Sequence, residues 1–91
     1  ALTSIDHMQS ILRELKAILE HVTGKAGLAE RLSDTANVID DVGLDSLEMM
    51  NFMLEIERRL AVDIDFDKLD FDAMRSLSVL AGFLAKVRQA R

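Results

Sequence analysis

The chain has 91 residues, of which 49% are hydrophobic, and a formal net charge of −5 at pH 7. This length suits a single domain with one small core, spanning residues 1–91. The absence of cysteine excludes a disulfide framework and a thiolate metal site. No apolar run approaches the length of a membrane span, and the first residues lack a signal-peptide pattern, so we expect a cytoplasmic protein without membrane contact.

The acidic residues are concentrated in the middle of the chain. Residues 34–72 hold twelve acidic and three basic residues, a charge of −9, whereas residues 73–91 hold four bases and no acid. The central charge repels nucleic acid and attracts basic protein surfaces, so we expect protein partners with basic patches and no nucleic acid. We interpret Lys86, Arg88 and Arg91 as cations at the end of a helix, where the helix dipole favours them.

Apolar residues recur at helical spacing along the chain, and no segment alternates as a strand would. We predict a first helix from Ser4 to a stop at Gly24, a second from Ser46 to about Leu60, and a last helix capped by Ser76. The first helix carries Ile5, Met8, Ile11, Leu12, Leu15, Ile18, Leu19 and Val22, and the last carries Leu77, Leu80, Phe83, Leu84 and Val87. The predicted fold is all-α, a small helical bundle with three main helices plus a short helix.

Two connections join the main helices. Residues 24–45 form a loop longer than most, and such loops are usually functional or anchored. We expect residues 26–32 to add a helical turn and four apolar side chains to anchor the loop, namely Leu28, Leu32, Val38 and Ile39. The second connection, residues 65–71, has room for a helical turn or two at most.

The second helix is apolar on more than one face. One stripe holds Leu47, Met50 and Leu54, and the neighbouring face holds Met49, Phe52, Met53, Ile56 and Leu60. A helix that only covers a core needs a single stripe, so the second one is available for other contacts. The methionines, which are unbranched, either belong to the core or repack around guests and partners.

The start of the second helix presents one hydroxyl among acidic residues. Asp45 is predicted to be the N-cap, and Glu48, three residues later, completes a capping box. Ser46 is then the first helical residue, and its side chain points toward solvent. Free backbone N–H groups and the helix dipole favour a phosphate at this place, so the geometry suits a phosphorylated serine.

The Gly-Leu-Asp-Ser-Leu run at residues 43–47, followed by an amphipathic helix, resembles the attachment site of acyl carrier proteins. Residues 32–43 resemble the family's long first loop, and residues 60–65 resemble the exit from its second helix. The resemblance implies that Ser46, next to Asp45, carries 4′-phosphopantetheine, which a phosphopantetheinyl transferase moves from coenzyme A. It also implies a protein that is not an enzyme, with an interior that opens to shelter an acyl chain.

The resemblance further implies a partner-facing surface on a monomer. Partners would be acyl-loading, elongating or transferring enzymes with basic docking patches, and Leu47 and Met50 would lie on the partner-facing side. The charge pattern along the second helix adds five further contact residues, namely Asp40, Asp41, Glu48, Arg58 and Arg59. The two arginines interrupt the negative charge, which suggests that they exclude standard fatty-acid enzymes. The alternative is that they form exposed pairs with Glu55 or Asp63.

A few residues bear on which biosynthetic pathway the protein would serve and on the alternative functions. An Asp before the serine is similar to fatty-acid and polyketide carriers rather than to aminoacyl or peptidyl carriers, which remain an alternative. Asn51 and the arginine pair depart from fatty-acid carriers and favour a specialised biosynthetic pathway. A second alternative is an unmodified helical interaction module that docks through its acidic surface.

Two other chemistries are disfavoured by spacing. Residues 63–67 begin like a calcium loop, but Lys68 replaces the required glycine and Met74 the required glutamate. A serine hydrolase needs a base near its nucleophile, and the two histidines, His7 and His21, both fall in the first helix. We therefore expect neither a metal site nor catalysis.

Overall fold

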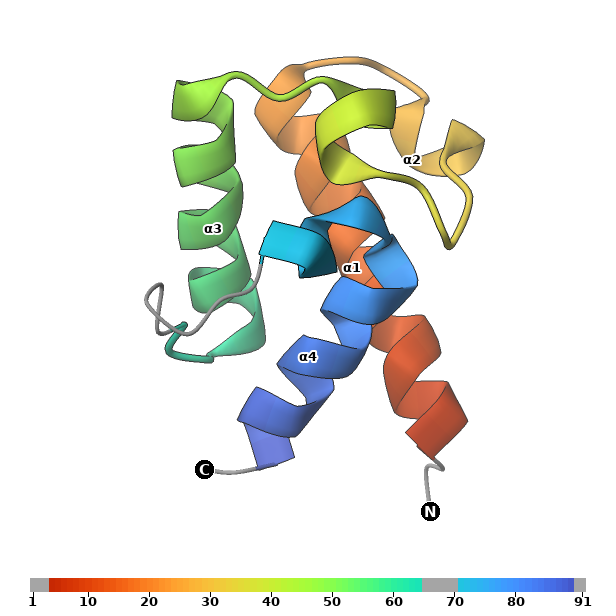
Figure 1. Ribbon diagram of the computed structural model, residues 1–91, viewed down its shortest axis with the longest axis vertical. Coiled ribbons are helices and arrows are strands. Elements are labelled where there is room, and N and C mark those ends of the chain that lie inside the picture. Colours follow the sequence, from red (N-terminus) through yellow and green to blue (C-terminus); the bar gives the residue numbers. More distant parts are fainter. Residues whose placement is uncertain (1–3, 65–70, 90–91) are drawn as a thin grey trace.

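The computed structural model describes residues 4–64 and 71–89, which form helices and connecting segments without a strand. In chain order the elements are α1 (Ser4–Thr23), α2 (Leu28–Arg31), the π-helix η1 (Val38–Val42), α3 (Ser46–Leu60), the 3₁₀-helix η2 (Phe71–Arg75) and α4 (Leu77–Gln89). The prediction of a small all-α fold with three main helices is confirmed. Figure 1 shows α3 beside α1, with α4 crossing α1, and the start of α1 and the end of α4 at the lower side of the view.

Helix α1 organises the core, because it packs against α2, α3 and α4. Its apolar stripe is fully covered at Leu15, Ile18 and Leu19, each 0% exposed. Helix α3 contributes Phe52 and Ile56, also 0% exposed. Since burying one such side chain contributes about 1.5–3 kcal/mol, these contacts are the main source of stability.

The main helices begin and end near the predicted signals. α1 ends one residue before Gly24, whose φ of 70° lies in the left-handed region that glycine adopts without strain. α3 spans the predicted range, and α2 supplies the helical turn expected in the long connection. The Glu20 carboxylate accepts a hydrogen bond from the Ala29 N–H at 3.2 Å, so α1 caps this short helix.

The long connection is anchored by a slightly different set of side chains from the predicted one. Leu28 and Val38 are buried, and Leu32 packs partly against the core. Ile39 was wrongly expected to be an anchor, since its side chain is 42% exposed. The turns of η1 direct Val38 and Val42 inward, so that Val42 takes the place expected for Ile39.

The connection also ties itself to the start of α4. The N–H of Leu77 donates to the Ala36 carbonyl at 3.0 Å, and the N–H of Ser78 donates to the Asp34 carbonyl at 2.8 Å. The Ser78 hydroxyl donates to the same Asp34 carbonyl at 2.8 Å, and Lys16 forms an ion pair of 2.7 Å with the Asp34 carboxylate. These loop carbonyls accept hydrogen bonds from first-turn N–H groups of α4. We had predicted that Ser76 would cap this helix.

The end of α3 is held by one glutamate. Ala61 adopts a left-handed φ of 53° and ends the helix, and its N–H donates to the Glu57 carbonyl. The Glu57 carboxylate accepts a hydrogen bond from the Ile64 N–H at 3.0 Å. The following residues 65–70, with most of the predicted helical turn and of the rejected calcium loop, lie outside the described residues.

Candidate functional site

The start of α3 is closed by its own side chains. The Asp45 carboxylate accepts a hydrogen bond from the Glu48 N–H at 2.7 Å, and the Glu48 carboxylate accepts one from the Asp45 N–H at 3.1 Å. This is the predicted capping box, and it requires only residues within one helical turn. The hydrogen bonds that cap the helix start are therefore made between residues close together in the sequence.

Ser46 is exposed at the first position of α3. The capping box engages Glu48 N–H, whereas the N–H groups of Ser46 and Leu47 precede the first residue that can bond within the helix. Gly43, with a φ of 74° and nothing near the place where a Cβ would stand, makes the open turn that leads into the helix. An exposed hydroxyl beside helix-start N–H groups fits a covalently attached phosphate.

Four carboxylates flank this hydroxyl in the sequence, and the structure leaves at least three of them exposed. Asp40 and Asp41 belong to η1, where the Asp41 carboxylate accepts from the Asn37 N–H at 2.8 Å and the Asp40 carboxylate from the Asn37 side chain at 3.3 Å. Both side chains, with Asp45, remain exposed to solvent. The surface before and at the start of α3 is thus strongly acidic and attracts cationic groups.

An apolar stripe on α3 begins next to Ser46. Leu47, Met50 and Leu54 are 70%, 58% and 53% exposed, and their spacing places them on one side of the helix. The inward residues Phe52, Ile56 and Leu60 are buried, so the predicted division of the two faces is confirmed. Of the methionines, Met53 belongs to the core, Met49 packs against it and Met50 is exposed.

Arg58 and Arg59 lie near the other end of α3 and bind acidic side chains of the protein itself. Arg58 Nη2 lies 2.7 Å from Glu55 Oε2, Arg59 Nε lies 3.2 Å from the same oxygen, and Arg59 also approaches Glu14 of α1 at 3.9 Å. The hydrogen bond from Arg58 lowers the pKa of Glu55, and the same bond raises the pKa of Arg58. The structure thus shows the predicted alternative, pairing with Glu55.

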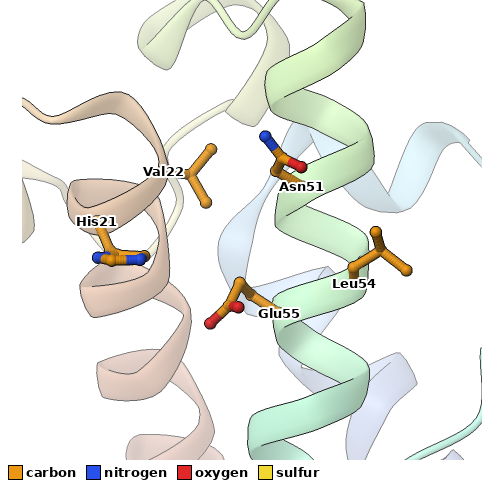
Figure 2. A pocket seen from close by; sticks show the side chains of 5 residues that line it. All are labelled: His21, Val22, Asn51, Leu54 and Glu55. Carbon is orange, nitrogen blue, oxygen red and sulfur yellow. The ribbon is translucent and has the colours of Figure 1, made fainter.

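A surface groove between α1 and α3 was not predicted. This α1–α3 groove has a volume of about 290 Å³ and is lined by His21, Val22, Asn51, Leu54 and Glu55. Figure 2 shows the side chains of Asn51 and Glu55 pointing toward α1, with Leu54 on the outer side. The groove depends on how two helices distant in sequence pack, so the sequence contained little sign of it. The one hint was Asn51, a polar residue between the two apolar faces of α3.

The described residues contain neither a metal-ligand cluster nor a membrane-spanning helix. Residues 4–64 and 71–89 contain no cluster of three acidic or histidine side chains that could hold a metal ion. Within the same ranges, no helix has the length and apolar character needed to cross a bilayer.

The comparisons with known proteins point to one family. The sequence model described as "Phosphopantetheine attachment site" matches residues 13–84. An acyl carrier protein from Syntrophobacter fumaroxidans (strain DSM 10017 / MPOB) is 28% identical over 74 residues, which cover 80% of this chain and 89% of the relative. No solved structure matches. The chain therefore belongs to the phosphopantetheine attachment family, whose members hold 4′-phosphopantetheine covalently as carriers and are not themselves catalysts.

Proposed function

We propose that Ser46 is the attachment residue and that the protein carries acyl groups of the fatty-acid or polyketide type as thioesters between enzymes. The observation that carries this proposal is the exposed Ser46 hydroxyl at the first position of a self-capped helix, inside the region that matches the family. The acyl cargo is supported by the relative, which is named as an acyl carrier protein.

Attachment is a phosphoryl transfer that a phosphopantetheinyl transferase catalyses. The Ser46 oxygen forms a bond to phosphorus while the pyrophosphate bond of coenzyme A breaks, the hydroxyl proton passes to a base of the transferase, and adenosine 3′,5′-bisphosphate leaves. The capping box between Asp45 and Glu48 keeps the helix start formed, and the N–H groups of Ser46 and Leu47 favour the phosphate. The attached group supplies the thiol that a chain without cysteine lacks.

The partner surface is proposed to lie along the apolar stripe and its acidic border. Leu47 and Met50 offer exposed apolar area, while Asp40, Asp41 and Glu48 favour partners with basic patches. Arg58 and Arg59 would lie at the far end of that surface, with much of their charge offset by Glu55. Asn51 and these arginines support a dedicated partner in a specialised pathway, served by a monomer in the cytoplasm.

Intact-mass spectrometry tests the proposal directly. Incubation with coenzyme A and a broad-specificity phosphopantetheinyl transferase is expected to add one pantetheine arm to the wild type and none to Ser46→Ala. Ser10→Ala, which removes an exposed hydroxyl from α1, is the matched control and should be modified normally. No addition to the wild type, or an unchanged addition to Ser46→Ala, contradicts the proposal.

A further inference from the structure

Met50 is the most exposed of the five methionines of the chain. Its side chain is 58% exposed, whereas Met53 and Met74 are 4% and 0% exposed. Met8 and Met49 are half-buried and pack against the core. The chain has no cysteine, so in the apo form its only sulfur atoms are these five thioethers. Because burial shields a sulfur atom from a dissolved oxidant, the packing of the other four directs oxidation to Met50.

Met50 also lies at the centre of the apolar stripe on α3. Residues three and four positions apart are neighbours on a helix surface, so Met50 stands next to Leu47 and Leu54, which are also exposed. Ser46, four residues earlier, lies about 40° around the helix axis and about 6 Å along it. Long helical side chains cover the preceding turn, so the Met50 side chain lies over the turn that begins with Ser46. A partner that reaches the Ser46 hydroxyl across this stripe therefore covers the Met50 sulfur.

We propose that Met50 is a reversible oxidation site, at which a peroxide switches partner docking off without unfolding the protein; this rests on the proposed partner surface. The Met50 sulfur attacks one peroxide oxygen, the O–O bond breaks, and a sulfur–oxygen bond forms. With hydrogen peroxide the thioether is oxidised to a sulfoxide and the peroxide is reduced to water. A methionine sulfoxide reductase releases the oxygen as water, using two electrons and two protons from thiols, and restores the thioether.

The sulfoxide has different consequences in the free protein and at an interface. In the free protein the added oxygen is solvated, because the Met50 side chain lies outside the core, so the fold is retained. At an interface the same oxygen leaves water and faces an apolar surface that offers no hydrogen-bond donor, which weakens docking. Oxidation of Met53 or Met74 would instead place the oxygen inside the core and destabilise the protein.

Peroxide treatment of the full chain in its apo form tests the proposal, with catalase added before the transferase so that only the carrier is oxidised. Intact mass and peptide mapping are expected to show one added oxygen, on Met50, and thermal melting should be unchanged. The kcat/KM of the phosphopantetheinyl transferase for the oxidised protein should fall about ten-fold. It should recover after treatment with both methionine sulfoxide reductases, one for each sulfoxide epimer.

Three variants isolate the site. Met50→Leu keeps an apolar side chain of similar size, so its kcat/KM should be the same before and after peroxide. Met50→Gln places a polar group at this position permanently and should show the loss of kcat/KM without peroxide. Met8→Leu, which removes a half-buried methionine of α1, is the matched control and should respond to peroxide as the wild type does.

The outcomes separate this inference from the proposed function. Oxygen added first at another methionine, or a lower melting temperature of the singly oxidised protein, overturns Met50 as the site. An unchanged kcat/KM after oxidation of Met50, together with a lowered kcat/KM in Leu47→Ala, overturns the switch alone. An unchanged kcat/KM in both overturns the proposed partner surface and the switch with it.

Discussion

The starts of α3 and α4 differ in which groups accept hydrogen bonds from their backbone N–H groups. At α3 the Asp45 carboxylate accepts from the Glu48 N–H and the Glu48 carboxylate accepts from the Asp45 N–H, so both bonds are made by residues of the helix start itself. At α4 the first-turn N–H groups are served by the carbonyls of Asp34 and Ala36, more than forty residues earlier in the chain. The start of α3 is thus capped by residues next to it in the sequence and stays open to solvent, whereas the start of α4 is fixed by distant segments.

The largest expected contrast comes from truncating a leucine at each start. Leu77→Ala, at a side chain that is 0% exposed, should lower the free energy of unfolding by about 2–5 kcal/mol, because it leaves a cavity. Leu47→Ala, at a side chain that is 70% exposed, should change it by less than about 0.5 kcal/mol. Urea denaturation of both variants measures the difference, and similar losses would contradict the contrast.

Leu47→Ala also tests the proposed partner surface. Leu47→Ala should lower kcat/KM of the phosphopantetheinyl transferase by at least about five-fold, which corresponds to losing about 1 kcal/mol of partner contact.

A smaller effect is expected from removing the caps. Asp45→Ala should destabilise the protein by about 1 kcal/mol, because the Glu48 N–H loses its acceptor, and Asp45→Asn should retain most of the stability. Ser76→Ala should cost less than about 0.5 kcal/mol, since loop carbonyls serve the start of α4. Thermal unfolding measures all three, and an equal loss in Ser76→Ala would show that α4 also depends on a side-chain cap.

The smallest expected effect is a pH dependence of the free energy of unfolding, caused by the ion pair near the end of α3. An exposed ion pair is expected to stabilise the protein less than a helix cap does. The hydrogen bond from Arg58 holds the pKa of Glu55 in the folded state below 4.5, the ordinary value of a glutamate side chain. The ionised form thus favours the folded state, so the contribution is present above pH 4.5 and is lost as the pH falls through the lower folded pKa. Exposure of the pair keeps the effect small.

Glu55→Gln is the variant that isolates this dependence. The difference in the free energy of unfolding between the wild type and Glu55→Gln should be constant near neutral pH and should shrink as the solution is acidified. Arg58→Ala should weaken the same pH dependence, because it removes the leading cause of the lowered pKa. A difference that grows on acidification would contradict the assigned sign.

Features that depend on neighbours in the chain could be predicted from the sequence. The capping box needs a carboxylate and a glutamate three residues apart, and the two faces of α3 follow from helical spacing. The exposed position of Ser46 follows from the same local geometry.

Features that depend on packing between distant segments could not be predicted. The outward direction of Ile39 was missed for another reason: it results from a π-helix, which ordinary helical spacing does not indicate, and whose start is held by the Asn37 side chain accepting from the N–H groups of Ile39 and Asp40. The ties of Asp34 and Ala36 to α4 and the α1–α3 groove depend on how helices meet in space. Helical spacing predicts which face of a helix is apolar, but it does not predict which segment packs against that face.

The ties between the long connection and α4 also bear on the order of folding. The bond from the Ser78 hydroxyl to the Asp34 carbonyl joins residues 44 apart in sequence. Closing a loop of that length costs about 3 kcal/mol in chain entropy, apart from a constant. Because that cost precedes the contacts that offset it, α4 is expected to dock last and to set the folding rate of a molecule whose other hydrogen bonds are largely local.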